Sequence, residues 1–261
     1  MIDLVDITLH YSVKPVLRNL SLRVESGELV GVMGANGTGK STLLQVAAGV
    51  LSPLKGYVEI DGIRRRSTVD NELAVRQRTV YLAADPWLPG STSGREFMIA
   101  VGTLYSIDAD RLIDHAEELI QLFHLEEVAD SPISTYSSGQ KKKAALCATL
   151  ITETPVMILD EPFAGGLDPA GIAALRRILK QKAENDDITV LMASPVPEIV
   201  EQVAHRVAII HHGKILACDT PEGLRTAAGC DGSLGEVMER LIDPEFAHRL
   251  DEYVKGERLN D

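Results

Sequence analysis

A run of glycines between an apolar stretch and a predicted helix constrains this chain more than any other feature. Residues 34–42 read Gly-Ala-Asn-Gly-Thr-Gly-Lys-Ser-Thr, and they follow the apolar residues 29–33. This pattern predicts a buried strand, a glycine-rich loop and a helix that begins near Lys40. Successive backbone N–H groups of such a loop point inward, and the positive end of the helix dipole faces the same space. The segment is therefore predicted to hold phosphate groups.

The side chains of this loop suit a nucleotide that is bound together with Mg²⁺. We expect Lys40 to reach the terminal phosphates and to act in catalysis, and the Ser41 hydroxyl to ligate Mg²⁺. The loop residues predicted to bind the nucleotide are Asn36, Gly37, Thr38, Gly39, Lys40, Ser41 and Thr42.

A second candidate site lies at residues 155–162, where a buried strand is predicted to end in two adjacent acids. A strand in a protein core has no structural use for two neighbouring carboxylates. Asp160 is predicted to hold Mg²⁺ through water, and Glu161 to orient or deprotonate the attacking water. The alternative is a strand end with solvated acids, which the glycine loop upstream disfavours.

Composition and charge exclude several classes of protein. The chain has 261 residues, 45% of them hydrophobic, which is enough for a sizeable core. A net charge of -12 argues against nucleic acid as the main partner. The basic triplets 64–66 and 141–143 are interpreted as solvated or phosphate-proximal patches. No apolar run approaches the length of about 18 residues that a membrane span needs, and no secretory signal is apparent at the start, so we expect a cytoplasmic protein.

Hydrophobic periodicity predicts an α/β fold with two additions. The first 60 residues alternate apolar and polar positions, which indicates an antiparallel sheet around the strand that feeds the loop. A helical sub-domain is predicted over about 86–150, and after it strands alternate with helices, as in a parallel sheet covered on both faces. The expected organisation is one nucleotide-binding domain over 1–225 and a helical extension over 226–261.

Between the two candidate sites stands the sequence Tyr-Ser-Ser-Gly-Gln at 136–140, which resembles the signature of ATP-binding cassette (ABC) proteins. The motifs follow that family's order over about 2–242. The resemblance implies a P-loop NTPase (RecA-like) core with a parallel sheet, an N-terminal antiparallel β sub-domain and an inserted helical sub-domain. It implies ATP and Mg²⁺ as cofactors.

The resemblance also assigns residues outside the glycine loop. Ser137, Gly139 and Gln140 at a helix start would form a second anion nest for the ATP of another subunit. Tyr11 would stack on adenine with Val16 nearby, although a tyrosine at the end of a strand is as often a core residue. Residues 167–168 resemble the loop that contacts the partner subunit.

Two positions depart from the family's pattern. Ala84 stands where the family has a glutamine that touches Mg²⁺, and Pro195 stands where it has a histidine that bonds the γ-phosphate. Proline has neither a ring nitrogen nor a backbone donor for that bond. We therefore predict slow hydrolysis, unless Ser194 or a paralogous subunit replaces the histidine.

The function implied is an ATP-binding and ATP-hydrolysing subunit that energises a separate membrane permease through ATP-driven dimerisation, similar to separately encoded exporter ATPases. It would act on the inner face of the cell membrane, as a homodimer or with a paralogue. The surface around residues 87–97 would receive the permease, although Trp87, as the only tryptophan, is expected to be buried. The alternatives are a soluble cassette ATPase without a membrane partner and a degenerate regulatory subunit with little hydrolysis.

Overall fold

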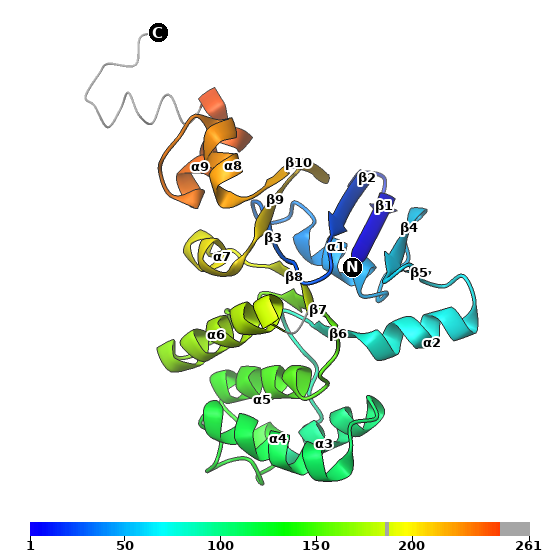
Figure 1. Ribbon diagram of the computed structural model, residues 1–261, viewed down its shortest axis with the longest axis vertical. Helices are drawn as coiled ribbons and strands as arrows, with labels where there is room; N and C mark the ends of the chain where they lie inside the picture. Colours follow the sequence, from blue (N-terminus) through cyan, green and yellow to red (C-terminus); the bar gives the residue numbers. More distant parts are fainter. Residues whose placement is uncertain (186–187, 246–261) are drawn as a thin grey trace.

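A six-stranded sheet forms the centre of the protein in the computed structural model, which describes residues 1–185 and 188–245 (Figure 1). The strand order is β10-β9-β3-β8-β7-β6, and all pairs are parallel except β9 with β10. The strands are β3 (Leu29–Met33), β6 (Thr79–Leu82), β7 (Val156–Asp160), β8 (Thr189–Ala193), β9 (Arg206–His211) and β10 (Lys214–Asp219). The predicted α/β class with a parallel core is confirmed.

Side chains along the central strands point alternately to the two faces of this sheet, and each face has its own hydrophobic core. In β7, Val156 and Ile158 belong to the core shared with the antiparallel sheet, and Met157 and Leu159 belong to the core shared with the helices. Successive side chains of a strand point to opposite faces. Because both faces are covered, the central strands read as continuous apolar runs in the sequence.

The second sheet is antiparallel, with the order β2-β1-β4-β5. It consists of β1 (Ile2–His10), β2 (Pro15–Val24), β4 (Lys55–Ile60) and β5 (Ile63–Arg64), and helix α1 (Lys40–Ala47) shares its core. This is the N-terminal β sub-domain that was predicted. Helix α2 (Val69–Arg78), which follows it, was not predicted, because Val75 is its only buried residue and its apolar stripe is correspondingly weak.

The predicted helical sub-domain lies at one end of the molecule, at the bottom of Figure 1. It contains α3 (Gly94–Leu104), α4 (Ala109–Leu122), the short 3₁₀ helix η1 (Ile133–Thr135) and α5 (Ser138–Leu150). Helix α5 packs against the central sheet, and its residues from Lys142 to Leu150 are all buried. This helix therefore joins the sub-domain to the edge of the sheet where β6 and β7 end.

Four more helices complete the described chain. No helix within residues 1–185 and 188–245 is long and apolar enough to cross a membrane. They are α6 (Pro169–Asn185), α7 (Pro197–Val203), α8 (Pro221–Ala228) and α9 (Leu234–Ile242). Helix α9 packs against α7 and α8. The predicted boundary at residue 225 falls inside α8, and residues 246–261 of the predicted C-terminal extension lie outside the described residues.

Candidate functional site

The glycine loop joins β3 to α1, and its backbone can be built only with glycine at key positions. Gly34, Gly37 and Gly39 have φ angles of 154°, 78° and 107°. A Cβ atom at Gly34 would lie 2.3 Å from the carbonyl oxygen of Ile210, so the close approach of β9 also demands glycine there. The predicted strand, loop and helix are present, and the helix begins at Lys40.

Lys40 is buried within this loop. Its ammonium donates to the carbonyl oxygens of Gly34 at 2.8 Å and Ala35 at 3.1 Å. Burial lowers the pKa of Lys40, and the charges of Glu161 and Asp160 oppose that shift. The structure thus brings the lysine of the loop into the field of the acid pair, which lies far along the chain.

The acid pair meets the loop because β8 lies between β3 and β7. Ala193, at the end of β8, is opposite both Val32 of β3 and Asp160 of β7. The carboxyl ends of parallel strands form one edge of the sheet, which is where α/β proteins bind ligands.

Asp160 is a strong candidate for holding a metal ion. Its side chain is only 2% exposed, and its Oδ1 atom has no hydrogen-bond partner within the described part of the chain. Burial raises the pKa of Asp160, while hydrogen bonding from Ser41 and the charges of Lys142 and Lys40 oppose that shift. Mg²⁺ favours carboxylates and substrate phosphates and keeps several of its waters. An unpaired buried carboxylate oxygen beside the Ser41 hydroxyl fits this preference.

Glu161 turns the chain sharply out of β7. Its φ angle is 48°, in the left-handed region that glutamate rarely adopts, and its N–H donates to the carbonyl oxygen of Ala193 at 2.9 Å. Backbone strain of this kind is characteristic of functional sites. The turn leaves the Glu161 side chain half-buried beside Lys40 rather than in the core.

The aromatic candidate Tyr11 lies beside the start of α1. Its hydroxyl is 3.3 Å from the Thr42 hydroxyl, and its side chain is 62% exposed, so it is not a core residue. Val16 packs next to the loop, because a Cβ atom at Gly39 would lie 3.3 Å from Val16 Cγ1. Both residues therefore flank the P-loop.

The signature residues form the start of α5. The Ser137 hydroxyl accepts from the N–H of Gln140 at 3.3 Å, and Gln140 Oε1 accepts from the N–H of Ser137 at 2.8 Å, which is a capping box. A Cβ atom at Gly139 would lie only 2.6 Å from the carbonyl oxygen of Gly166. Among the described residues, no hydrogen bond joins this segment to residues 34–42. The helix start is thus fixed against the loop that follows Glu161.

The two positions that depart from the family's pattern are both exposed. Ala84 lies in the loop after β6, and Pro195 follows β8. Between Pro195 and β8, Ser194 is buried and its hydroxyl oxygen accepts from the N–H of Val196 at 3.2 Å. That leaves the hydroxyl hydrogen of Ser194 as a donor at the edge of the sheet where Glu161 lies.

Several polar groups of this region were not found from the sequence. The basic triplets were interpreted as solvated or phosphate-proximal patches, and the solvated alternative is wrong for Lys142, Lys143 and Arg65, which are buried. Lys143 pairs with Asp168 at 2.8 Å. One signal was available: residues 144–150 are apolar almost without interruption, which indicates a buried helix that begins within the triplet 141–143. Burial and the charge of Asp160 raise the pKa of Tyr81, on the neighbouring strand, to about 12, so its hydroxyl is neutral.

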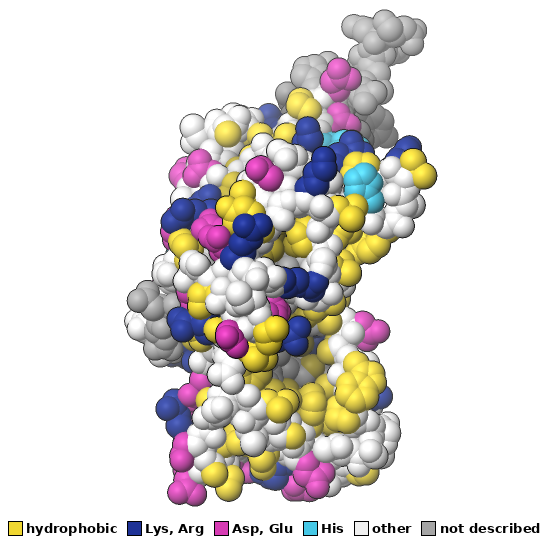
Figure 2. Space-filling view, turned by 90° about the vertical axis from the view of Figure 1, so that its right-hand side faces the viewer, with side chains coloured by type: hydrophobic (Ala, Val, Ile, Leu, Met, Phe, Trp, Pro, Cys, Tyr) yellow, Lys and Arg dark blue, Asp and Glu magenta, His cyan; other side chains and the backbone are white. Residues whose placement is uncertain are grey.

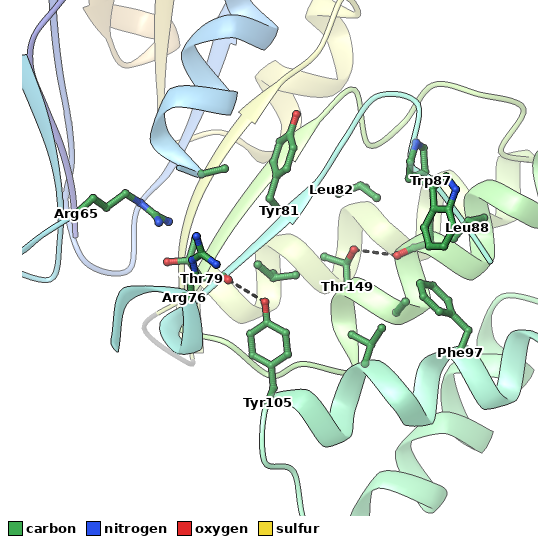
Figure 3. Close-up of a pocket in the computed structure, with 16 residues that line it drawn as sticks. Arg65, Arg76, Thr79, Tyr81, Leu82, Trp87, Leu88, Phe97, Tyr105 and Thr149 are labelled. Atoms are coloured by element: carbon green, nitrogen blue, oxygen red, sulfur yellow. Dashed lines mark hydrogen bonds between the residues drawn. The ribbon is translucent and has the colours of Figure 1, made fainter. Parts of the chain in front are cut away.

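A cavity of about 420 Å³ lies between β6, α2, α3 and α5. Arg65 and Arg76 lie at one end of it, and Trp87, Leu88 and Phe97 at the other (Figure 3). Figure 2 views the molecule from the right-hand side of Figure 1. It shows hydrophobic side chains around a hollow in the lower part of that face, with Lys and Arg side chains above them. Trp87 is 83% exposed, so the expectation that it is buried is wrong.

A P-loop after a buried strand, with a carboxylate pair at the end of a strand in the same parallel sheet, defines the class of P-loop NTPases. Residues 17–164 match the family model described as ABC transporter. The chain belongs to this family, as an ATP-binding subunit, and ATP binding and hydrolysis are general in it.

Individual relatives agree with this assignment. The daunorubicin resistance ATP-binding protein DrrA3 of Streptomyces coeruleorubidus is 34% identical over 85% of this chain and 68% of its own. The ABC-type transporter ATP-binding protein EcsA of Bacillus subtilis is 27% identical over 95% of this chain and 99% of its own. A solved ATP-binding subunit of an ABC transporter superposes with a TM-score of 0.85 at 26% identity, covering 92% of this chain and 99% of that one.

Proposed function

We propose that this chain binds ATP with Mg²⁺ and hydrolyses it to energise a transporter whose membrane permease is a separate chain. The observation that carries the proposal is the placement of Asp160 and Glu161 beside Lys40 at one edge of the sheet. Lys40 and the loop N–H groups would bind the phosphates, and Ser41 and Asp160 would hold Mg²⁺, which neutralises charge on the phosphate oxygens. Glu161 would accept the proton of the attacking water.

ATP would bring two such domains together. The start of α5 presents backbone N–H groups and the positive end of a helix dipole, which suit an anion. The P-loop of the same chain already supplies one phosphate site. The start of α5 is therefore proposed to meet the ATP held by a second copy or by a paralogue, through Ser137, Gly139 and Gln140. Two ATP molecules would then lie in the interface, and hydrolysis would reopen it.

Hydrolysis by the isolated chain is proposed to be slow. Pro195 cannot donate a hydrogen bond to the developing charge on the γ-phosphate, and Ala84 has no polar side chain. Loss of one such donor typically costs about a hundredfold in rate. The retained pair Asp160 and Glu161 favours slow hydrolysis over a purely regulatory role.

The permease is proposed to dock on the cavity between β6, α2, α3 and α5. An exposed tryptophan beside Leu88 and Phe97 is an unusual apolar surface for a protein with a net charge of -12. The names of relatives fit a transport role: one is a daunorubicin resistance protein and another a bacitracin transport protein. The chain would then be cytoplasmic and peripheral on the inner face of the membrane.

Phosphate release by the purified chain tests the catalytic part of this proposal. Wild type should release phosphate from ATP·Mg²⁺, and Glu161→Gln should not. Glu161→Gln should also sediment as a dimer with ATP·Mg²⁺ and as a monomer without it, either alone or mixed with a paralogue. Equal phosphate release by wild type and Glu161→Gln would refute the assigned chemistry.

The membrane part needs a separate test. Membranes that hold the chain would be solubilised in detergent, and integral membrane proteins that co-purify with wild type and with Trp87→Ala would be compared. Leu104→Ala is a matched control, because Leu104 is 75% exposed on α3 but does not line this cavity. Selective loss with Trp87→Ala is expected. No co-purifying membrane protein in any sample would favour a soluble cassette ATPase.

A further inference from the structure

Lys142 has a buried ammonium that the proposed chemistry does not use. It lies in the second turn of α5, its side chain is 4% exposed, and within the described part of the chain its Nζ atom has no hydrogen-bond partner. An ammonium carries three donors, and a buried charge is costly unless it is paired. A side chain held in this state at the edge of a site calls for a functional explanation.

The stem of Lys142 follows the loop that comes after Glu161. A Cβ atom at Gly165 would lie 3.5 Å from Lys142 Cδ, so the stem passes beneath this part of the loop. Gly165 and Lys142 also line a cavity of about 670 Å³ together with Ala84 and Asp85. The ammonium is therefore held at the same edge of the sheet as Ala84, whose side chain offers no polar atom.

The charges that surround this ammonium are the carboxylates of the site. Burial lowers the pKa of Lys142, and the charges of Asp160, Glu161 and Asp85 oppose that shift. The charges of Asp160 and Glu161 also act on Lys40 of the P-loop. The charges of two lysines thus act on Asp160 and Glu161, one from the core and one from the helical sub-domain. Asp160 Oδ1 is likewise a buried atom without a protein partner in the described residues.

We propose that Lys142 is a positioning residue of the hydrolytic centre, whose buried ammonium acts on the Asp160 and Glu161 carboxylates from the helical sub-domain through its charge and without a direct hydrogen bond. The inference rests on the proposed ATP hydrolysis. Lys142 is on α5, and the first residues of α5 are proposed to meet the ATP of the partner subunit. Any displacement of α5 would therefore move the Lys142 ammonium relative to Asp160 and Glu161 of the same subunit.

Folding and turnover should respond to Lys142→Met in different ways. Removing an unpaired buried charge and keeping the apolar stem should leave the melting temperature of the nucleotide-free protein equal to that of wild type or higher. The turnover number kcat should fall at least tenfold, while KM and the affinity for a fluorescent ATP analogue should change less than threefold. Lys142→Arg, which keeps the charge, should restore much of kcat.

Lys141→Met is the matched control, because it removes the same formal charge one position earlier from a side chain that is only half-buried. It should keep kcat within twofold of wild type. The inference is overturned if Lys142→Met keeps wild-type kcat, or if its melting temperature falls and Lys142→Arg does not restore kcat. If wild type releases no more phosphate than Glu161→Gln, the proposed function itself fails.

Discussion

Tyr136 anchors the start of α5 to the helical sub-domain, and the cost of cutting this anchor can be worked out from its contacts. Its hydroxyl donates to the carbonyl oxygen of Val128 at 2.6 Å and accepts from the N–H of Gly94 at 3.2 Å. The ring is buried, so water cannot readily replace either partner in Tyr136→Phe. The substitution removes two hydrogen bonds and leaves the ring in place.

A buried hydrogen bond contributes about 1 kcal/mol to the free energy of unfolding. Tyr136→Phe should therefore lower that free energy by about 2 kcal/mol, which for a chain of this size corresponds to about 4 to 8 °C in melting temperature. Tyr105 provides the matched control, because its hydroxyl makes one hydrogen bond, to the carbonyl oxygen of Thr79 at 3.0 Å. Tyr105→Phe should lose about half as much.

Urea denaturation followed by far-UV circular dichroism measures both losses, and calorimetry checks the melting temperatures. The signature residues Ser137 and Gly139 follow Tyr136 directly, so ATP-dependent dimerisation should also weaken in Tyr136→Phe and not in Tyr105→Phe. A loss below about 0.5 kcal/mol for Tyr136→Phe, or equal losses for the two variants, would refute the reasoning.

Three further predictions concern the nucleotide. Lys40→Ala removes the charge that would meet the phosphates, so affinity for ATP·Mg²⁺ should fall at least tenfold, or about 1.4 kcal/mol, and an unchanged fluorescence titration would contradict this. Gly139→Ala places a Cβ atom 2.6 Å from the Gly166 carbonyl oxygen, and in the Glu161→Gln background it should abolish the ATP-dependent dimer seen by sedimentation. Pro195→His restores a donor near the γ-phosphate, so phosphate release should rise about tenfold or more; no increase would indicate that another group already supplies it.

Features that depend on short stretches of chain were predictable. The P-loop follows from residues 29–42 alone, because the strand, the glycines and the helix start are all local. The strand that leads into Asp160 and Glu161 was equally clear from its continuous apolar run. Helix α2 was missed because a helix that buries only Val75 carries almost no periodic signal.

Some features that depend on distant segments were predicted wrongly. Trp87 was expected to be buried by its type alone, but the loop after β6 leaves it 83% exposed. Lys142 was interpreted as part of a solvated or phosphate-proximal patch, but it is not solvated, because the loop after Glu161 covers its stem. Hydrophobicity sets only an average tendency to be buried, and the neighbours supplied by other elements decide each case.

The sequence by itself determined the class of this protein and the chemical groups at its site, because backbone geometry and residue type suffice to define a phosphate loop and an acidic strand end. Only the tertiary structure decided which of these groups meet. The register of β8 between β3 and β7 sets Glu161 against Ala193, and the packing of α5 brings Lys142 to the same edge of the sheet. Such contacts join residues far apart in the chain, and no local pattern encodes the distance between them.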